Sequence, residues 1–254
     1  MTNEENIYHT ADLMRLIQKD HPGYRSSSLY SKIKEMENLG QITRIGKDRY
    51  LGKKLTSFDY ELESSVVRNV DKVMRRSYSE DFPYAIFETA PILNRFLNHL
   101  LERNVILLEA PRFFLQHVFH TLKGEGFQNV LLHPSREEVF LYAEDGCILL
   151  LPLVSKAPID IFRKRITIES LIVDILCSPI LGCFFEEAEI PAMVEEALTN
   201  YKVRFDTLRT YAKRRNALDR LLRTVPETMR ALIDDNKTYL HTGEHPKDPR
   251  RIQG

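Results

Sequence analysis

Residues Ser26 to Gly52 have the sequence SSSLYSKIKEMENLGQITRIGKDRYLG. In its first half, apolar residues recur at the three- and four-residue spacing of one helix face, at Leu29, Ile33, Met36 and Leu39. The three leading serines supply hydroxyls that can accept the open N–H groups of a helix start, and Gly40 suits a left-handed helix end. Beyond it, polar and apolar residues alternate around Gly46-Lys47-Asp48. The stretch therefore predicts a helix followed by a β-hairpin with a basic tip.

The opposite side of this helix carries hydroxyl, amine and amide groups, on Ser27, Tyr30, Ser31, Lys34 and Asn38. Groups of this kind contact phosphates and base edges in the major groove of DNA. Upstream, Thr10 can cap a helix from Ala11 to about Asp20. His21-Pro22-Gly23 ends that helix because proline cannot continue its hydrogen bonds. Helix, turn, helix and hairpin in this order predict a winged helix-turn-helix domain over residues 1–55.

The predicted domain is basic within a neutral chain. Lys19 to Lys54 contain nine Lys or Arg against four Asp or Glu, whereas the formal net charge of the chain is zero. A basic lobe on a neutral protein is directed at a polyanion, so we expect binding to double-stranded operator DNA; a module that docks only on protein is the alternative. The predicted DNA-binding residues are Arg25, Ser26, Ser27, Ser28, Tyr30, Ser31, Lys32, Lys34, Arg44, Lys47 and Arg49.

Length and composition limit the classes of protein to which this chain can belong. A chain of 254 residues with 43% hydrophobic residues can form one or two domains with substantial cores. No apolar run reaches the length of a membrane span, and the first ten residues are too polar for a secretory signal. The cysteines Cys147, Cys177 and Cys183 are odd in number and mostly in apolar surroundings, which is typical of the reducing cytoplasm. We therefore expect a cytoplasmic protein without membrane contact, zinc site or cofactor.

Residues 56–233 predict an α/β domain with C-terminal helices, and residues 234–254 a loosely ordered polar tail. Tyr60–Val73 predict a strand that runs into a helix. The other expected strands are Tyr84–Phe87, Val105–Leu108 and Val130–Leu132, and the expected helices between them are Ile92–Arg103 and Phe113–Gly124. Glu138–Tyr142 and Cys147–Val154 predict a hairpin around Glu144-Asp145-Gly146. Together with the first domain, this pattern favours the α+β class.

The last third predicts a broadly apolar helix capped by Thr167, which implies burial on more than one side. Further helices are expected at Glu186–Asn200, Val203–Tyr211, Asn216–Thr224 and after Pro226. A second basic segment, Lys202 to Arg223, holds eight Lys or Arg against two acids. Its candidate surface is Arg204, Arg209, Lys213, Arg214 and Arg215. This surface is either a second phosphate-contacting face, for DNA or RNA, or a solvated face that balances the acids of residues 186–196.

Several segments, in this order, resemble the AbiEi-type antitoxins, the transcriptional-regulator half of type IV toxin–antitoxin pairs. They follow the predicted winged helix and are Glu88-Thr89, Leu93-Asn94-Arg95-Phe96 with His99, Ile106-Leu107-Leu108-Glu109, Pro158 after Leu153-Val154-Ser155, ITIESLIVD at residues 166–174 and YKVRFDTLRTYAKRR at residues 201–215. The chain departs from the family pattern at Ser170, where Lys is common, and at Pro91, where a large aromatic is usual. The resemblance covers most of residues 5–220.

The resemblance implies a cytoplasmic protein that represses its own operon through the winged helix. It further implies that the C-terminal domain counteracts a nucleotidyltransferase-like toxin encoded beside it, without a stable complex between the two proteins. RNA is a possible further partner, as a substrate of the toxin.

An enzyme is the alternative class. Glu88, Glu109 and Asp145 follow predicted strands and could gather as the metal-binding acids of a nuclease targeted to DNA by its winged helix. No Asp-x-Glu or Glu-x-Lys pair accompanies them, and His117 and His120 lack a third ligand nearby. No glycine-rich phosphate loop or nucleophile elbow is present. The sequence therefore predicts no catalytic residue and no metal site.

Overall fold

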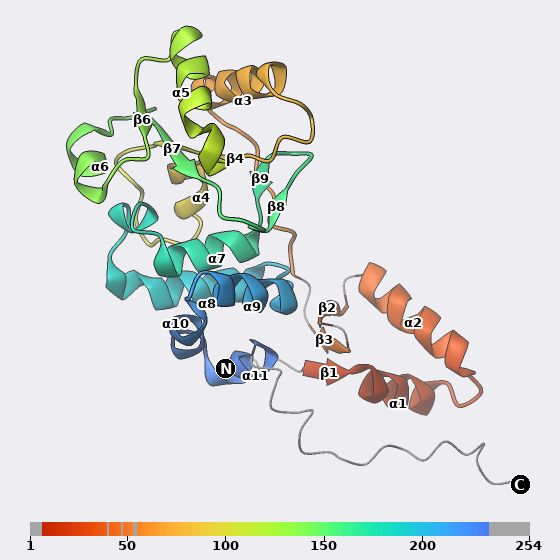
Figure 1. The fold of residues 1–254 in the computed structure, drawn as a ribbon. Coiled ribbons are helices and arrows are strands. Elements are labelled where there is room, and N and C mark those ends of the chain that lie inside the picture. Colours follow the sequence, from red (N-terminus) through yellow and green to blue (C-terminus); the bar gives the residue numbers. More distant parts are fainter. Residues whose placement is uncertain (1–6, 40, 47, 53–54, 234–254) are drawn as a thin grey trace, which may run out of the picture.

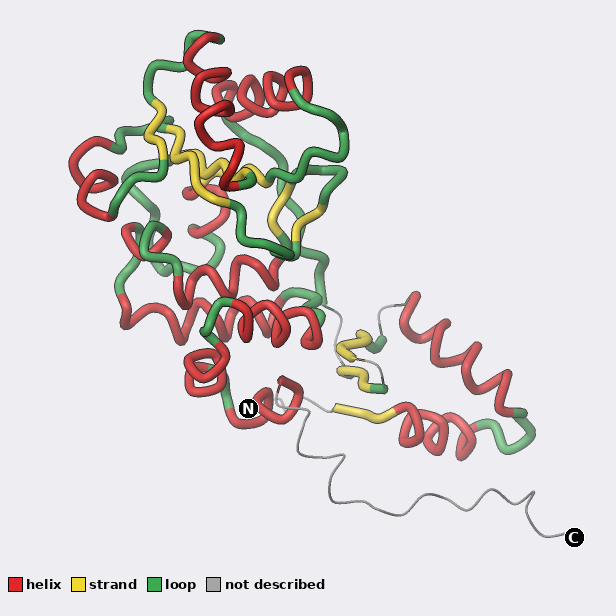
Figure 2. Tube along the Cα trace, viewed as in Figure 1, coloured by secondary structure: helices red, strands yellow, loops and turns green. Residues whose placement is uncertain are grey.

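The computed structural model describes residues 7–39, 41–46, 48–52 and 55–233 and has an α+β fold. A small N-terminal lobe projects from a larger body (Figure 1). Helices are more extensive than strands in both parts, and the strands are short (Figure 2). The described helices include none with the length and apolar character needed to span a bilayer.

The N-terminal lobe is a helical pair packed on a small antiparallel sheet. Its elements are β1 (Ile7–His9), α1 (Thr10–Asp20), α2 (Ser26–Asn38), β2 (Thr43–Gly46) and β3 (Arg49–Leu51). The sheet order is β1-β3-β2. The apolar faces of the two helices meet one face of this sheet in a separate small core of Leu13, Ile17, Leu29, Ile33, Ile42 and Tyr50.

The body is built on a four-stranded sheet of order β4-β5-β7-β6. Its strands are β4 (Ala85–Glu88), β5 (Ile106–Ala110), β6 (Val130–Leu132) and β7 (Ile148–Pro152). β4 is antiparallel to β5, whereas β5, β7 and β6 are parallel. Successive side chains of a strand point to opposite faces, so Leu108 packs with α3 (Ser65–Ser77) and α5 (Leu115–Gly124), and Leu107 joins the core on the other face.

That other face is covered by the C-terminal helices (Figure 1). They are α7 (Ile168–Cys177), α8 (Ile190–Asn200), α9 (Phe205–Arg214), α10 (Leu218–Thr224) and α11 (Glu227–Ile233). Residues Ile168 to Leu176 of α7 are all buried, as the broad apolar pattern predicted. The remaining elements are α4 (Thr89–Leu93), α6 (Arg136–Tyr142), the hairpin β8 (Ile159–Asp160) with β9 (Arg165–Ile166), and the 3-10 turns η1 (Arg112–Phe114), η2 (Leu181–Cys183) and η3 (Glu187–Glu189).

Three sequence predictions in the body are wrong. Residues 138–142 belong to helix α6, and β7 runs parallel to both of its neighbours, so no hairpin forms there. The reason is a capping box: Ser135 Oγ accepts from the Glu138 N–H, and Glu138 Oε2 accepts from the Ser135 N–H, which starts a helix. The helix expected over residues 92–103 ends at Leu93. Tyr60 lies in a loop, and only the helix that follows forms.

Candidate nucleic-acid interface

Helix α2 buries its apolar residues and exposes the predicted polar face. Leu29 and Ile33 are buried in the small core, whereas Tyr30 is 60% exposed. Arg25, the three serines, Ser31, Lys34 and Asn38 are also exposed. The hydroxyl, amine and amide groups therefore lie together along the solvent side of one helix.

The two lysines of helix α2 differ in their electrostatic setting. Lys32 Nζ lies 2.9 Å from Glu35 Oε1, and this hydrogen bond raises the pKa of the lysine. In the described part of the chain, no carboxylate lies within 4.0 Å of Lys34. Lys34, in the middle of α2, is consequently the cation of this helix best placed to contact a phosphate.

The start of α2 differs from the prediction. Arg25 occupies the N-cap position in an extended conformation, and no side chain caps the helix. The serines therefore lie in the first turn, where Ser27 O accepts a 3.1 Å hydrogen bond from Ser31 Oγ. At the other end the helix stops at Asn38, so Leu39 leaves the apolar face and is 62% exposed. Gly40 lies outside the described residues.

The hairpin that follows carries two of its three predicted contact residues in the described chain. Arg44 on β2 is exposed, and Arg49 on β3 is partly buried. The pairing register shifts between Arg44 and Gly46. Lys47, predicted for the tip, lies outside the described residues.

The second face of the small sheet docks on the body. Ile45 and Leu51 join the large core that includes α9. The chain beyond the hairpin is held at both of its first described residues: the Leu55 N–H donates to Thr43 Oγ1 over 3.2 Å, and the Thr56 N–H donates to Asn200 O over 3.0 Å. In the opposite direction, the Lys202 N–H donates a 2.8 Å hydrogen bond to Thr56 O. The hairpin therefore packs against α1 and α2 on one face and against the body on the other.

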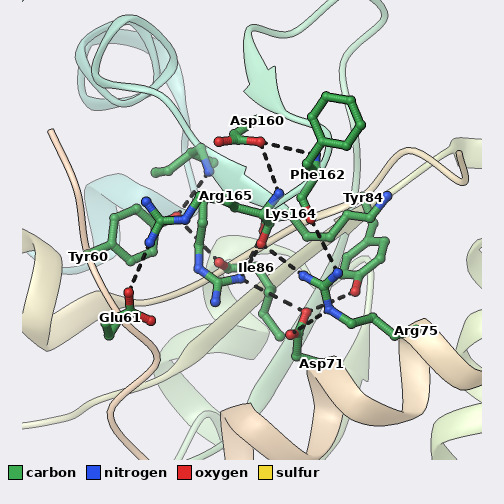
Figure 3. Close-up of polar contacts among 12 residues, drawn as sticks. Tyr60, Glu61, Asp71, Arg75, Tyr84, Ile86, Asp160, Phe162, Lys164 and Arg165 are labelled. Atoms are coloured by element: carbon green, nitrogen blue, oxygen red, sulfur yellow. Dashed lines mark hydrogen bonds and ion pairs between the residues drawn. The ribbon is translucent and has the colours of Figure 1, made fainter. Parts of the chain in front are cut away.

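A cluster of polar side chains fixes the linker, the segment around Tyr60 and Glu61 that joins the hairpin to the body (Figure 3). Tyr60 Oη donates to Ile86 O over 3.4 Å and accepts from the Ile166 N–H over 3.0 Å. Arg163, in the turn between β8 and β9, pairs with Asp59 and, at 2.9 Å, with Glu61. These contacts tie the linker to β4 and to the β8–β9 hairpin, so the N-terminal lobe has a set orientation on the body.

The second predicted basic surface is smaller than the sequence suggested. Arg204, Lys213 and Arg214 are exposed and Arg209 is partly buried. Arg215, predicted to face outward, turns into the protein instead: its guanidinium pairs with Asp174, donates to Tyr211 Oη over 2.9 Å and lies against that ring. The helix α9 ends at Arg214, so Arg215 leaves the helical face on which its neighbours lie.

Arg215 lies beside two acids of the body. Asp174 on α7 is buried and pairs with Arg215, whereas Glu109 on β5 is partly buried and interacts electrostatically with both of them. Burial and the neighbouring Asp174 raise the pKa of Glu109 to about 8. Burial also raises the pKa of Asp174, to about 6, against the opposing effect of Arg215.

The three acids considered as a nuclease site, Glu88, Glu109 and Asp145, do not lie together in the fold. Glu88 is 2% exposed, and its carboxylate accepts from the Glu63 N–H at 2.7 Å and from Asn104 Nδ2 at 3.1 Å. Asp145 accepts from the Asn104 N–H at 2.8 Å, so Glu88 and Asp145 share one end of the sheet. Glu88 is opposite Ile106 in the β4–β5 register, which places Glu109 three residues away, roughly 10 Å along the strand.

Metal-ligand geometry is likewise not found in the described ranges, where no group of three His, Cys, Asp or Glu is arranged to hold an ion. His117 Nδ1 lies 2.7 Å from Tyr78 Oη. The carboxylate of Glu88 therefore has a structural role: it accepts hydrogen bonds from the backbone N–H groups just before α3. No pattern in the sequence indicated this role.

A family model described as a family of unknown function (DUF6577) matches residues 28–230, which are 203 of the 254 positions. The chain belongs to the DUF6577 family. The DUF6577 match begins within α2 and ends within α11, so it includes the hairpin and all of the body except the last three described residues. No match was found among curated proteins or among solved structures.

Proposed function

We propose that this DUF6577 protein is a sequence-specific DNA-binding repressor whose N-terminal lobe is a winged helix-turn-helix. In this proposal α2 is the recognition helix, α1 supports it, and β2–β3 is the wing. The observation that carries the proposal is the exposure of the whole polar face of α2 while Leu29 and Ile33 anchor its opposite side. A helix presented in this way can enter the major groove, where side chains reach base edges.

The charge of the lobe supports the same proposal. Arg25, Lys34 and Arg44 are exposed on the helix start, the helix and the hairpin, which is the spread that contacts to phosphates on both sides of a groove require. A module that only docked on protein would be expected to expose an apolar surface on α2. The sole large apolar residues exposed along described positions 26–39 are Tyr30 and Leu39.

The test is binding of the full chain to the DNA upstream of its own gene, measured by fluorescence anisotropy against a scrambled duplex of equal length. We expect the upstream duplex to bind more tightly. A protein that neutralises about six phosphates should lose on the order of a thousandfold in affinity between about 50 and 200 mM salt. Equal affinity for both duplexes, or affinity that does not change with salt, would contradict the proposal.

We further propose that the protein is the antitoxin of a type IV pair and represses the operon that it shares with a nucleotidyltransferase-like toxin. This part rests on the resemblance to AbiEi-type antitoxins. It is tested by co-expression of the adjacent reading frame with and without this chain. Growth arrest that this chain relieves, without co-purification of the two proteins, is the expected result. An adjacent frame without toxicity would remove the antitoxin role and leave the DNA-binding role untouched.

A further inference from the structure

Two adjoining hollows of about 940 and 420 Å³ lie on the body, beside α6 and the chain that leads from α7 to α8. Both are lined by His99, Cys183 and Phe184, so they form one depression. Three segments supply most of its wall and rim: residues 99–103, 135–145 and 182–190. We call this depression, with the side chains of those three segments, the acidic groove.

The three segments carry a local excess of negative charge. They contain eight Asp or Glu against two Arg, although the chain as a whole is neutral. Glu102 and Glu137 have no Lys, Arg or His side chain within 4.0 Å among the residues that the structure describes. All of the acids except Glu189 are exposed; the eight are Glu102, Glu137, Glu138, Glu144, Asp145, Glu186, Glu187 and Glu189.

The arginines of the groove have structural partners. Each of the three donates to a backbone carbonyl, and these bonds hold the segments of the groove against one another and against α7. Even with all three counted, the acids remain in excess. The arginines are Arg103, Arg136 and Arg220, which donate to Ala143 O, Gly182 O and Leu176 O, respectively.

Large apolar side chains lie exposed among these acids. Leu100, in the smaller hollow, is 77% exposed, and Phe140, in the larger one, is 51% exposed. The next two residues of α6, Leu141 and Tyr142, are exposed as well. Groups of exposed apolar residues with polar rims mark surfaces that bind other proteins. The groove therefore offers apolar contact points within a negatively charged rim.

We propose that the acidic groove docks a partner protein through a basic amphipathic segment, whose aliphatic side chains contact Leu100 and Phe140 and whose cations contact Glu102 and Glu137. Complementary charge selects this occupant. A second copy that paired through the same face would bring the acids of both copies together, which is unfavourable. The proposal is independent of DNA binding, because none of the residues that line the groove belongs to the N-terminal lobe.

The probe is a fluorescently labelled peptide of Lys-Leu-Leu-Lys repeats, titrated with the full chain and followed by anisotropy. Two peptides of equal length separate the contributions: Glu-Leu-Leu-Glu repeats reverse the charge, and Lys-Ser-Ser-Lys repeats keep the charge and lack the apolar side chains. We expect saturable binding of the Lys-Leu peptide that weakens with salt, weaker binding of the Lys-Ser peptide and none of the Glu-Leu peptide.

Two variants of the groove test its charged and apolar parts. Glu102→Gln with Glu137→Gln should weaken binding of the Lys-Leu peptide on the order of fivefold. Leu100→Ser with Phe140→Ser should weaken it on the order of tenfold. Thermal melts check each fold, and Leu100→Ser alone replaces the double variant if that variant melts early.

Matched controls lie outside the groove. Glu80→Gln with Asp81→Asn removes two exposed acids before β4, and Phe162→Ser removes an exposed ring in the turn between β8 and β9. Both should bind the Lys-Leu peptide as the unmodified chain does. Groove variants that behave as these controls, or equal binding of the Lys-Ser peptide, would overturn the proposal. Self-association in light scattering that the Leu100 variant abolishes would also overturn it, because it would assign the groove to a second copy.

Discussion

The two basic regions of this chain have similar local charge and different structural roles. Residues 19–54 hold nine cations and residues 202–223 hold eight. In α2 the polar side faces solvent along its whole length, and Lys34 has no carboxylate within ion-pair distance in the described chain. In and after α9 the cations are divided: Arg214 is exposed, whereas the next residue, Arg215, turns inward to Asp174.

The difference shows that a count of cations does not locate an interface. A cation turns inward where the fold provides a buried acid to pair with it, and it stays exposed where the fold provides none. Among the described residues of the N-terminal lobe, none of the buried ones is an Asp or Glu, so its cations have no buried acid to pair with. The body buries Asp174 and partly buries Glu109, and burial of such charges requires a partner.

Removal of the inward cation should have the largest effect. Arg215→Ala leaves Asp174 buried without its guanidinium, which should lower the free energy of unfolding by about 3–5 kcal/mol. The measurement is urea unfolding at pH 7, with Lys213→Ala as control. Lys213 is exposed in the last turn of α9, two residues before Arg215, so its loss should cost less than about 0.5 kcal/mol. Equal stability of the two variants would mean that Arg215 is as solvated as its neighbours.

Removal of the outward groups of α2 should instead affect DNA binding without affecting stability. The triple variant Ser27→Ala, Ser31→Ala, Lys34→Ala should reduce affinity for the upstream duplex on the order of 100-fold, since base and phosphate contacts are lost together. Arg15→Ala is the control, because its side chain is 82% exposed on α1 and away from the α2 face. A triple variant that binds as Arg15→Ala does would place the interface elsewhere.

Because of Glu109 and Asp174, we expect the stability of the protein to depend on pH. The exposed side chains of α2 should not contribute to this dependence. The folded pKa of Glu109, about 8, is above its ordinary value of 4.5, so its stabilising effect is complete below about pH 4.5 and is lost as the pH rises through 8. Between these values stability should fall by up to about 1.4 kcal/mol per pH unit. Glu109→Gln cannot ionise and should flatten this slope in melts from pH 6 to 9, above the range in which the raised pKa of Asp174 contributes. A slope that persists in the variant would assign the proton to another group.

The smallest effect is expected from the outward cations of α9. Lys213→Ala with Arg214→Ala should weaken binding to the upstream duplex by less than about tenfold and reduce the salt dependence by at most about two phosphate contacts. The assay is the same anisotropy titration at several salt concentrations. A loss as large as that of the α2 triple variant would make α9 an equal part of the interface.

Helices α1 and α2 and the β2–β3 hairpin followed from local sequence signals, whereas strand β1 was not predicted. Leu29 and Ile33 recur at helical spacing and are buried, and Tyr30 and Ser31 between them are exposed. The strand Val130–Leu132 and the Thr167 cap of α7 were also predicted correctly, because each depends on a few adjacent residues. The segment 135–142 carried such a signal in Ser135 and Glu138, and the hairpin prediction overlooked it.

The amino-acid sequence alone therefore sets the local periodicities: which residues of α2 turn inward, and where most elements lie. The fate of individual charges depends on the assembled fold. Arg214 and Arg215 are adjacent and chemically identical, yet Asp174 draws in one of them from 41 residues away. Glu88, on strand β4, likewise accepts hydrogen bonds from the N–H groups of Glu63 and Ser64, which lie 25 and 24 residues earlier in the chain. Such pairings depend on distances that only tertiary packing creates, because Coulomb energy and desolvation are set by neighbours in space.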